Sequence, residues 1–280
     1  MSRSCHLQPF ESFGESLPLA LAAIGAEERL AGQKTVIIKP NLVTDDPPPV
    51  TLPVEAAMVL VRWLRKRTDA RIIIAEGTGD RLHSTIKVFD HLGYMDLADR
   101  YNLKLIDLNQ APVTELNRDD CRVFPQFYLP EILLDAFVIS FAVLKAHSLA
   151  DVTLSMKNMI GCAPPSFYQQ GGHWKKSAFH RQMHRAIFEL NLYRKPDLAL
   201  IDASVGLAEH HLGGPVCDPP PNRIVAGFDP VAVDAAGALL LGKDWRQIPH
   251  ITLADGVLGD ATIGETAFRM AQRAESEAKH

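Results

Sequence analysis

Two adjoining segments decide the fold of this chain: the apolar run FVISFAV at residues 137–143 and the polar stretch LKAHSLADVTLSMKNMIG at residues 144–161. An apolar run of this length, bounded by polar residues, predicts a buried strand. In an α/β sheet, the residues that follow a parallel strand lie at the carboxyl edge, where ligands bind. We therefore expect the polar stretch to carry the chemistry of the protein.

The polar stretch places several reactive side chains close together. We expect a helix over residues 149–159, in which Thr153 and Lys157 are four positions apart and share one face. Lys145 and His147 come just before this helix, separated from it by a short turn. Polar groups this dense after a buried strand indicate a functional site, whereas a solvated helix start with surface lysines is the plainer interpretation.

Three further apolar runs, at residues 34–38, 71–75 and 197–203, predict strands of the same sheet. Each ends in polar residues that a parallel sheet would bring to the same edge. The side chains at these strand ends are Lys39, Asn41, Glu76 and Asp202. A lysine after an apolar strand is either an anion ligand or a surface charge. A carboxylate there is an acid–base group, a metal ligand or the cap of a turn.

Helical patterns separate these strands, which is typical of an α/β fold. We expect one domain over residues 1–280, with a mostly parallel sheet and helices on both of its faces. The segment at residues 162–176 has no periodicity and is expected to form a long loop inserted after the central strand. This loop is a candidate lid over the site, and it is also where the domain would be subdivided.

Two later helices carry polar residues at informative positions. In the helix predicted at residues 177–193, His180 and His184 are four apart on one face, a spacing that suits a shared metal. The glutamate of an H-E-x-x-H motif is missing, so two ordinary histidines explain the pattern at least as well. Asp229 is expected to cap a further helix, on which Asp234 is buried by pattern and needs a partner.

The composition is that of a soluble globular protein. The 280 residues are 47% hydrophobic and 22% charged, and the net charge of −4 gives no basic field to recruit nucleic acid. No apolar run approaches the roughly 18 residues of a membrane span, and the N-terminus lacks the apolar core of a signal peptide. We therefore expect a cytoplasmic protein that binds neither nucleic acid nor a membrane.

Six motifs in a fixed order resemble the family known as domain of unknown function 362. They are IKPNLV at 38–43, LKAH at 144–147, TLSMKNMIG at 153–161, IDA at 201–203, GP at 214–215 and FDPVAVD at 228–234. The resemblance covers about residues 34–260, and many members of that family carry an added ferredoxin-type cluster domain. The cysteines of this chain form no C-x-x-C pair, so we expect no iron–sulfur cluster.

The family is also similar to the N-terminal domain of lactate racemase-like proteins. In those proteins a histidine, followed by a lysine in a glycine-rich segment, lines a nickel-cofactor site. The resemblance implies that His147 and Lys157 stand at the corresponding positions. In this chain, Leu154, Ser155 and Met156 stand where that segment has glycines before the lysine.

Convergence of Lys39, Lys145 and Lys157 in an acidic protein implies an anionic ligand. Mutual repulsion is expected to lower the pKa of at least one of these lysines, which suits acid–base work. Our first hypothesis is an enzyme acting on a small carboxylate-bearing metabolite by isomerisation, elimination or redox chemistry. The residues expected to bind the substrate are Lys39, Asn41, Thr153, Asn158 and Asp202. His147, Lys157 and Lys145 are the expected catalytic residues, with His147 exchanging the proton.

Two alternatives stay open. A metal-dependent oxidoreductase would hold iron, nickel or zinc with histidine and carboxylate ligands. Its candidate ligands are His147, His173, His180, His184 and Glu76, with Asp202 as a second carboxylate. A non-catalytic cofactor-binding protein would bind a nucleotide or metabolite tightly without turnover. The sequence names neither the substrate nor the oligomeric state, and a homodimer is left open.

Overall fold

The computed structural model describes residues 4–278 and is organised around one sheet of eight strands. The strands are β1 (Cys5–Pro9), β2 (Thr35–Pro40), β3 (Arg71–Glu76), β4 (Lys104–Asp107), β7 (Phe137–His147), β8 (Asp151–Thr153), β9 (Leu198–Leu207) and β10 (Arg223–Gly227). They lie in the order β1-β10-β9-β7-β2-β3-β4, with β8 paired to β7. A separate hairpin consists of β5 (Val113–Asn117) and β6 (Gln126–Pro130).

The sheet is mostly parallel, as the sequence predicts. Strands β9, β7, β2, β3 and β4 run parallel to one another, whereas β10 pairs antiparallel with β9 and β1, and β8 pairs antiparallel with β7. The chain builds outward from β2 through β3 to β4, then crosses to β7 on the other side of β2. This reversal opens a crevice between the carboxyl ends of β2 and β7, which is where α/β sheets bind ligands.

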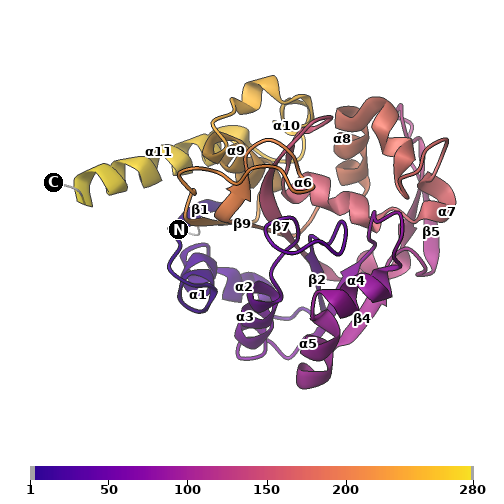
Figure 1. Cartoon of the computed structure of the whole chain (residues 1–280), viewed down its shortest axis with the longest axis horizontal. Helices are drawn as coiled ribbons and strands as arrows, with labels where there is room; N and C mark the ends of the chain where they lie inside the picture. The colour runs from indigo at the N-terminus through magenta and orange to yellow at the C-terminus, as the bar shows by residue number, and fades with distance from the viewer. Residues whose placement is uncertain (1–3, 279–280) are drawn as a thin grey trace.

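Helices cover both faces of the sheet, which confirms the predicted fold class (Figure 1). The helices are α1 (Phe13–Ala23), α2 (Ala26–Leu30), α3 (Val54–Leu64), α4 (Thr85–His91), α5 (Tyr94–Tyr101), α6 (Ser155–Asn158), α7 (Pro165–Tyr168), α8 (Met183–Arg194), α9 (Pro230–Leu240), α10 (Pro249–Ala254) and α11 (Ala261–Ala278). Short 3-10 helices are η1 (Glu131–Leu133), η2 (Met159–Cys162), η3 (Ser177–Gln182) and η4 (Trp245–Gln247).

Strand β2 shows how the two faces arise. Its side chains alternate: Val36 and Ile38 join the core formed with α1, α3 and α5, whereas Ile37 joins the core formed with α6, α8 and α9. A strand buried on both faces must be apolar along its whole length, which is why the run at the start of β2 is recognisable in the sequence. Figure 1 shows α1, α2, α3 and α5 on one side of the sheet and α8, α9 and α10 on the other.

The prediction of a helix over residues 149–159 is wrong. Strand β7 continues to His147, and the chain turns back at once into β8, so that Lys145 lies opposite Thr153. Asp151 takes a left-handed backbone conformation with φ of 60°, which permits the tight turn. Within that range, Ser155–Asn158 forms the short helix α6 and Met159 begins the 3-10 helix η2. The four-residue spacing indicated a helix, but pairing with the edge of β7 beyond the last residue that β2 pairs with satisfies the backbone instead.

Three other boundaries also differ from the sequence analysis. Strand β9 extends to Leu207, so Asp202 lies within the strand and not at its tip. The loop at residues 162–176 contains α7, and the helix predicted at residues 177–193 is divided into η3 and α8. His180 and His184 therefore lie on different elements, and the short strands β1 and β8 were not predicted.

The buried Asp234 has hydrogen-bond partners, as its position on an apolar helix predicts. Its carboxylate accepts hydrogen bonds from the Ser155 amide (2.8 Å), the Ser155 hydroxyl (2.5 Å) and the Met156 amide (3.0 Å). Asp229 caps α9 as predicted, accepting from the amides of Val231 and Ala232. Because burial raises the pKa of Asp234 to about 7, this carboxyl depends on those donors. The contact fixes the start of α6.

We predict that Asp234→Ala lowers the free energy of unfolding by about 3 kcal/mol, because it leaves buried amides of α6 without an acceptor. Urea denaturation followed by circular dichroism measures the change. The control is Asp244→Ala, which removes an exposed cap from η4 and should cost about 1 kcal/mol. Equal losses in the two variants would contradict this role for Asp234.

Candidate functional site

A cavity of about 330 Å³ lies at the carboxyl ends of β2, β3 and β7, beside α6. Most residues predicted for the site line it: Lys39, Asn41, Glu76, Lys145, His147, Thr153, Lys157, Asn158 and His180. The segment from Trp174 to Met183 forms another part of the wall. The sheet edge therefore brings together residues that lie more than a hundred positions apart in the sequence.

The lining of the cavity has an excess of basic side chains. Four lysines contribute to it, Lys39, Lys145, Lys157 and Lys176, whereas Glu76 is the one acidic residue among the described lining residues. Lys39 and Lys145 are fully buried and Lys176 is nearly so. A buried cation without a counter-ion is costly, so this imbalance favours a negatively charged ligand.

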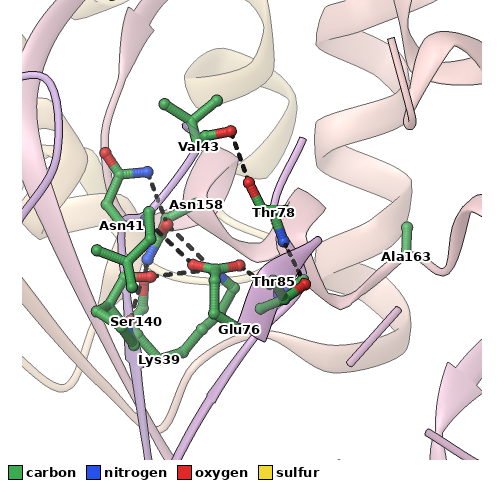
Figure 2. A network of polar contacts seen from close by, with 12 residues as sticks. Lys39, Asn41, Val43, Glu76, Thr78, Thr85, Ser140, Asn158 and Ala163 are labelled. Carbon is green, nitrogen blue, oxygen red and sulfur yellow. Dashed lines mark hydrogen bonds and ion pairs between the residues drawn. The ribbon is translucent and has the colours of Figure 1, made fainter. Parts of the chain in front are cut away.

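Glu76 is committed to Lys39, and the pair belongs to a buried network (Figure 2). The Lys39 amino group lies 2.8 and 3.0 Å from the two Glu76 oxygens and donates to Asn158 Oδ1 at 3.1 Å. Asn158 donates in turn to the Lys39 carbonyl and to Ser140 Oγ. The backbone amides of Gly77 and Leu42 also donate to Glu76. Strands β2, β3 and β7 are thereby joined to α6 beneath the cavity.

Gly161 makes this network sterically feasible. A Cβ added there would lie 2.1 Å from Glu76 Oε1 and 2.6 Å from Lys39 Nζ. The backbone after α6 can therefore approach the ion pair only where a side chain is absent. This contact gives a physical reason for the glycine at the end of the polar stretch.

The remaining lysines have lowered pKa values. Burial lowers the pKa of Lys157 to about 8, and no hydrogen bond or ion pair engages its amino group within the described part of the chain. Burial, and then the charge of Lys157, lower the pKa of Lys145 well below its usual range; Lys145 Nζ donates to the Val50 carbonyl at 2.5 Å. Repulsion between lysines was expected, but loss of hydration is the larger cause.

Lys176 was not singled out from the sequence. Its amino group donates to Asn109 Oδ1 and to the Ala163 carbonyl, and burial lowers its pKa to about 7. It lies at the end of an aperiodic loop, next to another lysine, so nothing in the sequence distinguished it from a surface charge. Trp174 and Phe179, which also line the cavity, were not predicted as site residues.

The hydrogen bonds of His147 define which of its ring nitrogens carries the proton. Its Nδ1 accepts from the backbone amides of Leu149 (3.0 Å) and Ala150 (3.2 Å), so the neutral ring carries its proton on Nε2. Burial, followed by the charge of Lys157, keeps the pKa of His147 far below its usual value. His147 is therefore a neutral hydrogen-bond donor at physiological pH. The ring of His211, also missed from the sequence, stacks on it at 3.8 Å.

Two polar atoms in the wall of the cavity have no partner. Asn41 Oδ1 and Thr153 Oγ1 are both buried and make no hydrogen bond with any residue from 4 to 278. The orientation of Asn41 is fixed, because its Nδ2 donates to Asn158 Oδ1 at 3.1 Å. Buried polar groups are nearly always satisfied, so orphaned atoms in a cavity point to a ligand that supplies the missing bonds.

Three predicted site residues lie outside the described cavity lining. Asp202 is buried and accepts from the amide and hydroxyl of Ser204, and its burial raises its pKa. His173 is exposed. His184 Nδ1 lies 3.0 Å from His250 Nδ1, and its other nitrogen lies 3.6 Å from Asp151. Of the predicted metal ligands, His147, His180 and Glu76 line the cavity, whereas His173 and His184 do not, and Glu76 is engaged by Lys39.

The fold of this chain has counterparts among known proteins. The sequence profile described as "Domain of unknown function (DUF362)" matches residues 36–239. The chain belongs to this family, which confirms the resemblance drawn from the six motifs.

A solved structure with a similar fold is the lactate racemase apoprotein from Thermoanaerobacterium thermosaccharolyticum. The TM-score is 0.51 and the sequence identity 13%, over 80% of this chain and 54% of that one. This chain therefore spans about half the length of that protein, and the likeness concerns the fold.

A thylakoid-associated protein of Synechocystis sp. is 23% identical over 246 residues, which is 86% of this chain and 73% of that protein. Within residues 4–278, no helix has the length and apolar character needed to cross a membrane.

We predict that Glu76→Gln lowers the free energy of unfolding by about 3 kcal/mol, because it leaves the buried Lys39 charge unpaired. The matched control is Glu265→Gln, which breaks exposed ion pairs to Arg246 and Arg269 and should cost less than about 1 kcal/mol. Chemical denaturation of both variants at one pH provides the comparison. A Glu76→Gln protein as stable as the control would show that the network does not hold the sheet edge together.

Proposed function

We propose that this protein is an enzyme that moves a proton at the carbon next to the carboxylate of a small metabolite. The observation that supports this most strongly is the excess of positive charge in the cavity, whose described lining contains four lysines and one glutamate. A carboxylate is the anion that this set of donors fits at this size, since about 330 Å³ is at the lower end for small-molecule sites.

In this proposal Lys157 is the general base. Its amino group has no partner among the described residues, and its pKa of about 8 leaves an appreciable fraction neutral near physiological pH. A general base works best when its pKa lies close to the operating pH. A lysine in water, with the usual pKa of 10.5, would be almost wholly protonated near physiological pH.

His147 has the complementary role of donor. Because both of its Nδ1 contacts are backbone donors, it presents Nε2–H, and its lone pair on Nδ1 is engaged and not free to accept a proton. We infer that this N–H stabilises the negative charge that develops on the carboxylate oxygens when the neighbouring carbon loses its proton. These contacts favour the donor role of the two expected for His147, while Lys145 attracts the anion.

The orphaned atoms suggest what else the ligand carries. Asn41 Oδ1 accepts only, so it needs a donor from the ligand, and a hydroxyl group would supply one. Thr153 Oγ1 can donate to a carboxylate oxygen. A small hydroxycarboxylate satisfies both atoms, and the likeness in fold to a lactate racemase apoprotein agrees with this class of substrate.

A nickel cofactor of the kind associated with lactate racemases does not fit His147 as this chain holds it. A metal ligand must offer a lone pair, and the neutral His147 ring directs its lone pair at two backbone amides. The proposal therefore includes no step through a metal at this residue.

We predict that the protein exchanges the hydrogen next to the carboxylate of its substrate with solvent. Incubating a panel of small hydroxycarboxylates in deuterium oxide, with mass spectrometric detection, tests this whatever the product is. Lys157→Met should reduce the exchange by about 10³-fold, within the range expected for loss of a general base. The control Lys87→Met, which removes an exposed lysine of α4, should leave the exchange unchanged. Tight binding without exchange would favour the non-catalytic alternative.

The rate of exchange should rise with pH through about 8, because only the neutral amine of Lys157 accepts a proton. A bound carboxylate stabilises the charged amine, so the midpoint under saturating substrate should lie higher than that of the free enzyme. Initial rates at low and at saturating substrate measure the two midpoints. A rate that falls as pH rises through this range would contradict Lys157 as the base.

A further inference from the structure

Outside the cavity, a second group of side chains converges on one point. Ligand atoms of Asp45, Asp80 and His83 all lie within 4.8 Å of one another. Asp45 follows β2, and Asp80 and His83 lie between β3 and α4. None of these residues belongs to the predicted metal ligands or lines the cavity.

The distances within this group are those of ligands around a common ion. His83 Nδ1 lies 3.5 Å from Asp45 Oδ2 and 3.5 Å from Asp80 Oδ2, which is long for hydrogen bonds. Two ligand atoms about 2.1 Å from the same metal are separated by roughly 3.0–3.5 Å. His91 Nδ1 lies 2.8 Å from Asp45 Oδ2, at hydrogen-bond distance, and so helps to orient this carboxylate beside the group.

Asp80 is oriented independently of any metal. It is 5% exposed, and its Oδ1 accepts from the backbone amides of Leu82 (2.6 Å) and His83 (2.9 Å). Its Oδ2 is left with the distant His83 nitrogen as its partner. No lysine or arginine forms an ion pair with Asp45 or Asp80 in the part of the chain that the structure describes. A buried carboxylate held in this way is typical of a ligand supported by its surroundings.

We propose that Asp45, Asp80 and His83 bind one divalent transition-metal ion of the zinc class, with water in the remaining position. Two carboxylates and one imidazole are a donor set that such ions accept, and the two negative charges of the carboxylates balance the ion. This site is separate from the anion-binding cavity, and the proposed proton transfer does not depend on it.

The position of the site gives the metal a structural role. Val43, near Asp45, and Gly79, beside Asp80, line the cavity, and Thr78 Oγ1 donates to the Val43 carbonyl at 2.9 Å (Figure 2). The Lys175 amino group donates to the His83 carbonyl, next to the cavity-lining Trp174. A metal at this point joins the segments after β2 and β3 and steadies one wall of the cavity.

The test is zinc binding by the whole chain, freed of metal with a chelator and titrated against a chromogenic competitor. Wild type should bind one zinc ion per chain. Asp80→Asn keeps an oxygen to accept from the two amides but removes the ligand charge, and it should weaken binding about tenfold or more, as should His83→Gln. Zinc should raise the melting temperature of wild type and not of Asp80→Asn.

Two controls distinguish this site from others in the chain. His184→Gln alters the other histidine cluster, and Lys157→Met alters the cavity; both should bind zinc as wild type does. Circular dichroism without metal verifies that each variant is folded. The proposal is overturned if wild type binds no stoichiometric zinc, if Asp80→Asn binds as tightly as wild type, or if His184→Gln is the variant that loses the ion.

Discussion

The described lining of the cavity contains four lysines and one carboxylate, that of Glu76. This excess of positive charge is the constraint on which the properties of the site depend. Glu76 is bound to Lys39 from both of its oxygens, which leaves the amino group of Lys157 without a counter-ion among the described residues. Burial then lowers the pKa values of Lys145, Lys157 and Lys176. An anion that enters the cavity relieves this cost, and its binding is therefore coupled to the protonation of the lysines.

Lys39 and Lys157 have different roles, the first structural and the second functional. Lys39 is fixed by Glu76 and Asn158, so it connects three strands to α6 and has little freedom to follow a ligand. Lys157 lies on α6, the start of which is held by Asp234 of α9. The flexible amine is thus carried by a rigid support. A catalytic group needs this combination, because its position has to be set before the substrate binds.

Much of the sheet and part of the cavity could be predicted from the sequence. The strands β2, β3 and β7 are buried on both faces, so their apolar composition made them recognisable as strands. The polar residues at their ends predicted the edge of the sheet where ligands bind. The order of the strands could not be predicted, because the crossing from β4 to β7 on the other side of β2 has no local sequence signal. Asp234 was also recognisable, because a carboxylate on an apolar helix needs a partner.

Other features depend on contacts that the sequence does not reveal. The spacing of Thr153 and Lys157 suited a helix, yet β8 forms because the end of β7 offers an unpaired edge. Lys176 and His211 come from loops without periodicity. Asp45 and His83 are brought together only by the parallel pairing of β2 with β3, and the tautomer of His147 depends on the turn after β7.

The central claim is that the Lys157 amino group is desolvated and free of a counter-ion. A direct measurement is an NMR titration of lysine side chains labelled with ¹³C at Cε, with the Lys157→Arg variant used to assign the signal. A midpoint close to 8 in the free protein, moving upward when a small carboxylate is added, is the predicted result. A midpoint at the ordinary 10.5, unchanged by carboxylates, would contradict this account of the cavity.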